Sequence, residues 1–196
     1  MKYLFILFLL LCSEKMFSQS ATYKLINKEN GTSSNISIRR TDDQVEINVL
    51  ANWNDKVRTY GQLTGKGIIT DNKATIKAEK KSQLCSVDLT FLKDSLDADF
   101  QDCENYQLPK SFSGIYTKIA DEVTGEYIVT ADICYFYSKP DEKSRKKGFA
   151  HTPEVLNIEE LFEGNWGFAT FMSEGKQLFG YVKLTDLKFK RTYLYD

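Results

Sequence analysis

The chain has little of the equipment that enzymes and membrane proteins usually carry. Its 196 residues include one histidine and three prolines. Beyond a short apolar run near the start, no segment approaches the roughly 20 residues of a membrane-spanning helix. No segment of useful length shows a helical period, and no glycine-rich loop precedes a helix, as a phosphate site would require. With an aromatic content of 13%, these absences favour an all-β protein.

Charge is balanced as well. Without the first twenty residues, 24 basic and 26 acidic residues remain, a net charge of −2. A protein that binds nucleic acid usually shows a basic surplus. We therefore expect no nucleic-acid partner.

The first twenty residues have the features of a secretory signal peptide. Lys2 precedes an apolar run at residues 3–11, and small residues stand at Ser18 and Ser20. Such a run is too short to span a bilayer. We expect cleavage after Ser20, or after Ser18, rather than lipidation at Cys12, which no small residue precedes. The mature chain is then periplasmic or secreted, without a transmembrane segment.

Three cysteines follow this leader, and an oxidising compartment permits a bridge between two of them. Apolar residues alternate with polar ones over residues 85–91 and 96–101, which predicts a β-hairpin with its turn at Lys93-Asp94. The register sets Phe91 opposite Leu96, and Val87 opposite Phe100.

In that register Asp102, not Cys103, faces Cys85. One extra residue near Gln101-Asp102, a β-bulge, would bring the two cysteines into reach. We predict a Cys85–Cys103 disulfide. The alternative is two free, buried thiols.

Residues 21–120 predict an antiparallel β-sandwich or barrel, because short period-two segments recur between turn signals. Phe112–Thr117 is the expected closing strand, and residues 121–125 are the expected linker. The other expected strands are 23–27, 35–39, 45–51, 57–62, 67–70 and 74–78.

A second unit follows the linker. Expected strands are 129–137, 155–161, 166–172 and 177–182, with a one-turn 3₁₀ helix at 185–187 and a lysine-rich loop at 138–148. Residues 189–196 are a tail or an extra strand of either unit.

Four motifs of this unit occur in an informative order: D-I-C-Y-F-Y-S-K-P, V-L-N-I-E-E, N-W-G-F-A and G-Y-V-K-L-T-D-L. Together they resemble a bacterial SH3 domain over residues 126–188. The resemblance implies a small β-barrel that recognises peptide or peptidoglycan. The first unit, with its G-x-G-x-x-x-x-N-x-A segment, paired cysteines and closing G-x-Y, loosely resembles small exported β-domains of uncharacterised bacterial proteins.

Aligned with that family, Cys134 and Phe136 point inward, so the rings beside them point outward. Amphipathic rings side by side suit a groove for peptide or glycan. The candidate groove consists of Tyr135, Tyr137, Trp166 and Tyr181. In the alternative, Trp166 and Tyr181 belong to the core, cover the linker or pack on the first unit. Phe168, Phe171 and Phe179 are assigned mainly to packing.

The lysine-rich loop holds Lys143, Arg145, Lys146 and Lys147. Such a run is usually a solvated loop. Its position beside the groove of the family also makes it a candidate contact for an acidic partner.

Catalytic candidates are few. Cys134 with His151 is the one pair that could act as nucleophile and base, but an inward, mid-strand cysteine lacks the electropositive setting of a thiolate. We expect no enzyme, no metal site and no cofactor.

The sequence therefore predicts an exported, all-β, two-domain protein whose function is non-catalytic binding in the cell envelope. One alternative is an inhibitor or immunity protein that binds an exported enzyme. Another is a structural SH3-like domain without a ligand.

Overall fold

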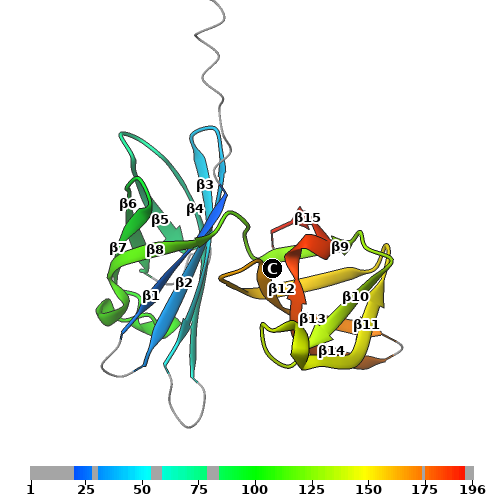
Figure 1. Cartoon of the computed structure of the whole chain (residues 1–196). Coiled ribbons are helices and arrows are strands. Elements are labelled where there is room, and N and C mark those ends of the chain that lie inside the picture. Colours follow the sequence, from blue (N-terminus) through cyan, green and yellow to red (C-terminus); the bar gives the residue numbers. More distant parts are fainter. Residues whose placement is uncertain (1–19, 28–30, 54–58, 79–83, 174, 193–196) are drawn as a thin grey trace, which may run out of the picture.

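The structure, a computed structural model, describes residues 20–27, 31–53, 59–78, 84–173 and 175–192. These residues form a closed eight-stranded barrel and a second sheet of seven strands (Figure 1). The predicted all-β class is confirmed, and the first unit is a barrel rather than a sandwich. The expected signal peptide lies outside the described residues, apart from Ser20. Within the described ranges, no helix has the length and apolar character needed to cross a bilayer.

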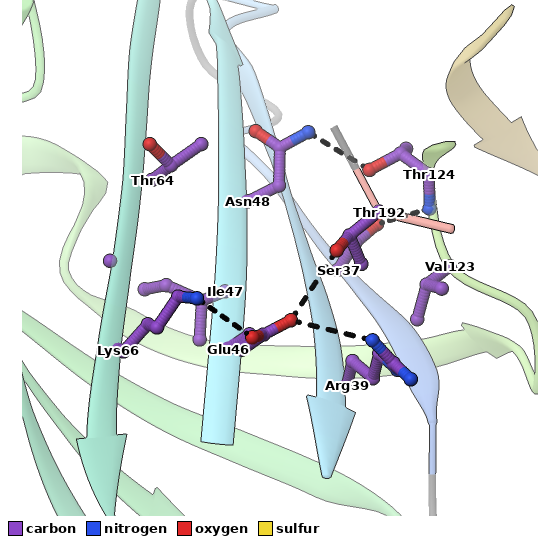
Figure 2. Close-up of a pocket in the computed structure, with 11 residues that line it drawn as sticks. Ser37, Arg39, Glu46, Ile47, Asn48, Thr64, Lys66, Val123, Thr124 and Thr192 are labelled. Carbon is purple, nitrogen blue, oxygen red and sulfur yellow. Dashed lines mark hydrogen bonds and ion pairs between the residues drawn. The ribbon is translucent and has the colours of Figure 1, made fainter. Parts of the chain in front are cut away.

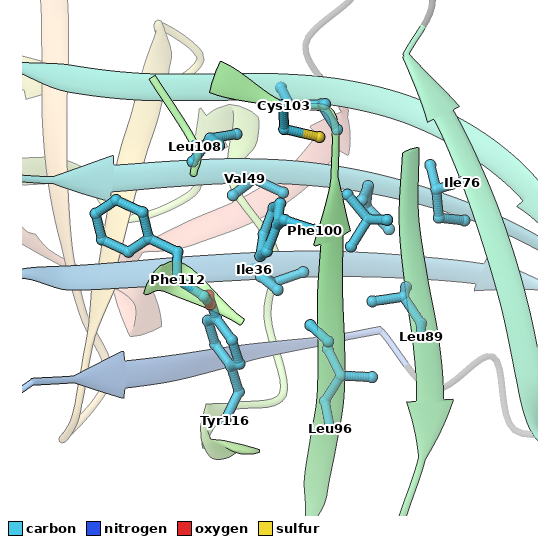
Figure 3. Close-up of a cluster of buried hydrophobic side chains, with 14 of the residues drawn as sticks. Ile36, Val49, Ile76, Leu89, Leu96, Phe100, Cys103, Leu108, Phe112 and Tyr116 are labelled. Carbon is cyan, nitrogen blue, oxygen red and sulfur yellow. The ribbon is translucent and has the colours of Figure 1, made fainter. Parts of the chain in front are cut away.

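The barrel is a meander: each strand pairs antiparallel with the next, and the last strand returns to the first. An eight-stranded barrel has an interior just wide enough to be filled by side chains. Here Ile36, Phe100 and Tyr116 are among the buried residues that fill it (Figure 3). The strands are β1 (Ala21–Ile26), β2 (Ser33–Thr41), β3 (Gln44–Asn52), β4 (Tyr60–Ile68), β5 (Lys73–Ala78), β6 (Ser86–Phe91), β7 (Ser95–Gln101) and β8 (Gly114–Ala120). Two 3₁₀ helices, η1 (Glu104–Tyr106) and η2 (Lys110–Phe112), connect β7 to β8.

The β6–β7 hairpin has the predicted register. Phe91 lies opposite Leu96, and Val87 lies opposite Phe100. Asp102 follows β7 in the left-handed region, with a φ of 54°. It is the extra residue that the sequence required. Cys103 rather than Asp102 then reaches the position opposite Cys85, and the predicted disulfide is confirmed.

Two of the strand predictions in the barrel were wrong. The segments 57–62 and 67–70 were expected to be separate strands, but residues 60–68 form the single strand β4; residues 57–58 lie outside the described residues. Gly65 and Gly67 interrupt the apolar pattern because β5 passes too close for a side chain. A Cβ atom on Gly65 would lie 2.6 Å from the carbonyl oxygen of Lys77.

The second sheet has the strand order β11-β10-β14-β13-β12-β9-β15. One of its faces buries a core that includes Tyr127, Phe136, Leu156 and Val182. The strands are β9 (Gly125–Val129), β10 (Ile133–Tyr137), β11 (Arg145–His151), β12 (Val155–Phe162), β13 (Trp166–Ser173), β14 (Lys176–Lys183) and β15 (Leu187–Arg191). The sheet also carries the 3₁₀ helices η3 (Glu142–Ser144) and η4 (Leu184–Asp186).

Two strand bounds in this sheet differ from those predicted, and the place of the C-terminal residues, which the sequence left open, is now clear. The single strand expected over 129–137 is wrong, because the chain bends at Ala131 and Asp132 between β9 and β10. There the amide of Thr130 donates to the carbonyl of Asp186 at 2.9 Å. The lysine-rich segment is a loop only as far as η3, and its second half is β11. As an edge strand, β11 is exposed at five of its seven residues, so it shows no clear period of two. Residues 187–191 form β15, which pairs with β9 and so belongs to the second sheet.

A polar seam joins the barrel to the second sheet. The Thr22 hydroxyl donates to the carbonyl of Glu122 at 2.8 Å, and the amide of Thr124 donates to the Ser37 hydroxyl at 3.3 Å. The side-chain amide of Asn48 donates to the Thr124 hydroxyl at 2.9 Å. The connecting residues therefore lie against the outer surface of β1–β3.

Candidate binding face

One face of the second sheet is covered by aromatic rings. On β10, Cys134 and Phe136 are buried inside, so the alternation of a strand turns Tyr135 and Tyr137 outward. The same alternation on β13 and β14 buries Gly167, Ala169, Gly180 and Val182 and turns their neighbours outward. Because β10, β14 and β13 are adjacent strands, six rings share one surface, which we name the aromatic face: Tyr135, Tyr137, Trp166, Phe168, Phe179 and Tyr181.

Two edge-to-face contacts, Tyr137–Trp166 and Phe168–Tyr181, and one tilted contact, Phe168–Phe179, link these rings. Tyr137 and Trp166 have ring centroids 5.0 Å apart. Phe168 lies 5.4 Å from Tyr181 and 6.5 Å from Phe179. Aromatic pairs at such distances contribute about 0.5–1.5 kcal/mol beyond the area that they bury. The rings are therefore held in place before any ligand arrives.

The structure brings together three of the four predicted groove residues. Tyr137 contacts Trp166 directly and pairs in register with Tyr181 on the neighbouring strand. Tyr135 lies on the same face but packs against Phe149 of β11, with centroids 6.4 Å apart. Tyr137 is only 7% exposed, so Trp166 and Tyr181, both half-buried, offer more of the accessible surface.

Sequence reasoning missed two rings of this face. Phe168 and Phe179 were assigned to packing, but the structure places both outside the buried core, and Phe179 is 55% exposed. The signal was present in the sequence. Phe168 is two residues from Trp166 and Phe179 is two residues from Tyr181, so strand alternation places each pair on one face. Phe171, by contrast, is buried.

Two cations of the predicted basic loop lie over rings of the face. The Arg145 guanidinium carbon is 4.6 Å from the centroid of Tyr135. Lys146 Nζ is 4.7 Å from the centroid of Phe179 and donates to the carbonyl of Phe179 at 2.7 Å. A cation over an aromatic ring is attracted by the ring quadrupole. Of the other two predicted basic residues, Lys143 lies in η3 and Lys147 on β11.

Lys183 is a third cation at the face, and it is paired. Its ammonium group donates to the carboxylate of Glu142. This hydrogen bond raises the pKa of Lys183, and the nearby Tyr137 adds to the effect. The pair ties η3 to the strand that carries Tyr181.

The opposite end of the face borders the seam. Glu160 accepts a hydrogen bond from the Asn35 amide at 3.0 Å and lies 3.6 Å from Lys24 Nζ. Lys24 also lies over the ring of Phe162, 5.2 Å from its centroid, and Phe162 packs on Tyr181 at 5.1 Å. Burial raises the pKa of the Glu160 carboxyl, although Lys24 and the Asn35 hydrogen bond partly oppose this. Burial also raises the pKa of Tyr181, and the Glu160 charge adds to it.

The seam itself contains a small cleft that is open to solvent (Figure 2). Glu46 lies within it, with its carboxylate 3.0 Å from Lys66 Nζ and 3.7 Å from Arg39. The Thr192 hydroxyl adds a contact of 3.3 Å to the same carboxylate. Because these charged and polar groups pair with one another, we assign the cleft to the contact between the two units. It is a weaker candidate for a ligand site than the aromatic face.

Cys134 and His151 are not brought together. Cys134 is fully buried, and burial raises its pKa to about 12, with a smaller contribution from the Asp186 charge. Its partner on β11 is the buried Ala150, so His151, the next residue, points to the other face of the sheet. There the imidazole packs against Phe149, with centroids 4.9 Å apart. Nothing in this arrangement would activate the thiol.

Comparisons add no relative: no protein-family model, no curated protein and no solved structure matches the chain. In the described part of the chain, no group of three or more histidine, cysteine, aspartate or glutamate side chains could hold a metal ion. The case for a function therefore depends on the geometry of the aromatic face.

Proposed function

We propose that this chain is an exported, non-catalytic binding protein and that the aromatic face is its ligand site. The observation that carries the proposal is the set of six outward rings on three adjacent strands. Large contiguous apolar patches on a protein surface usually mark a binding site. Export is supported by the leader-like first twenty residues, and the Cys85–Cys103 disulfide is compatible with it.

The ligand class follows from the resemblance to bacterial SH3 domains over residues 126–188. That resemblance favours peptide or peptidoglycan. Tyrosine and tryptophan suit either ligand, because they combine a large apolar area with a polar group and lose little rotamer freedom on binding. Trp166 and Tyr181 are both half-buried, whereas Tyr137 is buried and Arg145 lies over the ring of Tyr135.

Co-sedimentation with purified peptidoglycan tests the proposal. The parent protein is compared with Trp166→Ala and with Tyr60→Ala, a matched control because Tyr60 is 52% exposed on the barrel. Sedimentation of the parent and the control, but not of Trp166→Ala, would support the face as a wall-binding site. Equal sedimentation of all three would place the binding elsewhere, and no sedimentation of the parent would remove peptidoglycan as the ligand.

An inhibitor or immunity protein that binds an exported enzyme is the second candidate. The observation in its favour is the pair of cations on β11 that lie over rings of the face. Such a partner would cover about 800 Å² of this surface. Reversal of those charges would then reduce binding more than Trp166→Ala does, whereas a peptidoglycan ligand predicts the opposite order.

The third candidate is a structural SH3-like unit that binds no ligand. It would be favoured if the rings of the face were buried against the barrel. The ring partners of Trp166 and Tyr181 are Tyr137, Phe162 and Phe168, all of the second sheet. At the edge of the face, Glu160 and Phe162 are the residues that contact the barrel in these interactions.

A further inference from the structure

The cations around the aromatic face fall into two kinds. Lys24 and Lys183 each have a carboxylate partner, Glu160 and Glu142. Arg145 and Lys146 differ: across the described ranges, no carboxylate lies within ion-pair distance of either. Lys146 uses one donor on the carbonyl of Phe179, and an ammonium group has three. The β11 side of the face therefore presents positive charge that the protein itself does not neutralise.

The position of these cations also limits what the rings can bind. Arg145 lies 4.6 Å from the centroid of Tyr135, and Lys146 lies 4.7 Å from that of Phe179. Each covers a ring surface on which a sugar would otherwise stack. A planar guanidinium with five donors matches a carboxylate in a bidentate geometry. On this side of the face, a carboxylate is therefore a better match than a neutral sugar.

We infer that the occupant of this side of the face is an acidic, extended segment of another polypeptide. The inference rests on the proposed function, because it names the ligand chemistry of the same site. An extended chain sends successive side chains to opposite sides with a rise of about 3.3 Å per residue. Every second side chain of such a segment therefore faces the sheet, about 6–7 Å from the next. Among these, carboxylates can meet Arg145 and Lys146, and apolar side chains can meet Phe149 and Phe179, which are 43% and 55% exposed.

The β11 edge is not suited to pairing with the same edge of a second copy of this chain. β11 is the edge strand of the sheet and begins with three consecutive basic residues, Arg145, Lys146 and Lys147. Like charges on an edge strand oppose pairing of that edge with its own copy. They attract a chain of opposite charge, which also accelerates association at low ionic strength.

The experiment measures binding of the mature protein to a fluorescent random copolymer of glutamate and tyrosine. The parent is compared with the double variant Arg145→Glu/Lys146→Glu. A control, Lys73→Glu/Lys93→Glu, makes the same change of net charge at exposed lysines of the barrel. A lysine–tyrosine copolymer tests whether the ligand must be negatively charged. Polygalacturonate tests whether any anionic polymer binds. Circular dichroism checks that each variant is folded.

We expect the parent and the control to bind the glutamate–tyrosine copolymer, with affinity that falls as salt is added. The β11 variant should bind at least about tenfold more weakly, since two attractions become repulsions. The inference would be overturned if the β11 variant bound the glutamate–tyrosine copolymer as tightly as the parent does. It would also be overturned if the parent bound polygalacturonate as tightly as this copolymer, or did not bind the copolymer at all. The inference would also be overturned if the parent bound the lysine–tyrosine copolymer as tightly as the glutamate–tyrosine copolymer. If Trp166→Ala abolished that binding, the proposed function would still stand. If the proposed function itself is wrong, Trp166→Ala should bind every ligand tested, peptidoglycan included, as well as the parent does.

Discussion

Tyr137 and Trp166 pack edge to face at 5.0 Å, although their strands are not neighbours. β14 lies between β10 and β13, so this contact spans the width of a strand. The contact between the two rings therefore crosses three strands on the outer side of the sheet, at the centre of the aromatic face.

The first prediction concerns this contact. Tyr137→Ala and Trp166→Ala should each destabilise the protein, and the double variant should lose less than the sum, with a coupling of about 1 kcal/mol. Urea denaturation of the four proteins measures that coupling. For comparison, Trp166→Ala combined with Tyr60→Ala on the barrel should be additive. Additivity of Tyr137→Ala with Trp166→Ala would show that the two rings do not support each other.

The second prediction concerns the disulfide. Cys85 and Cys103 are 18 residues apart in sequence, and closing a loop of that size stabilises a domain by about 3 kcal/mol. The double variant Cys85→Ala/Cys103→Ala should lose about that much free energy of unfolding. A reducing agent should destabilise the parent by a similar amount and leave the double variant unchanged. A variant as stable as the oxidised parent would contradict the role given to this bridge.

The third prediction is a pH dependence at the seam. Burial raises the pKa of Glu160, so the folded protein holds this proton more tightly than the unfolded chain does. The resulting stability is fully present below the unfolded pKa of about 4.3 and is lost as the pH rises through the folded pKa. Relative to Glu160→Gln, the parent should therefore gain free energy of unfolding as the pH falls from neutral toward about 4.3.

Denaturant titrations at a series of pH values measure this difference. Glu160→Gln keeps an acceptor for the Asn35 amide but cannot titrate. Lys24→Met should raise the pKa of Glu160 further, because Lys24 favours the ionised carboxylate. A parent that loses stability relative to Glu160→Gln on acidification would show that the carboxylate is stabilised, not penalised, at the seam.

The fourth prediction concerns Cys134. Because burial raises its pKa to about 12, the thiol should resist alkylation by iodoacetamide in the native protein and react once the chain is unfolded. Mass spectrometry after labelling with and without denaturant measures this. Cys134→Ala should also leave binding to peptidoglycan or to the copolymer unchanged. Rapid labelling of the native protein would reopen the question of a reactive thiol.

Local patterns in the sequence were enough to predict much of this structure. The β6–β7 register followed from alternation and one turn, and the position of Asp102 followed from the need to bring Cys103 to Cys85. The inward direction of Phe136 came from the resemblance to bacterial SH3 domains, and strand alternation then turned Tyr135 and Tyr137 outward. The hairpin register and the bulge involve residues that are close in the chain, so period and spacing determine them.

Features that depend on distant partners were missed. The glycines of β4 look like breaks until β5 is seen to pass against them. Strand β11 looks like a loop because an edge strand with a basic segment lacks alternation. The contact of Tyr137 with Trp166 requires the strand order, which places β14 between β10 and β13 and which no local pattern reveals.

Mapping of backbone amide shifts by NMR decides whether the aromatic face is the ligand site. The mature protein would be titrated with soluble peptidoglycan fragments and, separately, with the glutamate–tyrosine copolymer. We expect at least one of them to shift amides along β10, β13 and β14, around Tyr137, Trp166 and Tyr181, and to leave β5–β7 of the barrel unchanged. Shifts confined to the barrel or to the seam cleft around Glu46, or no shifts with either ligand, would contradict this expectation.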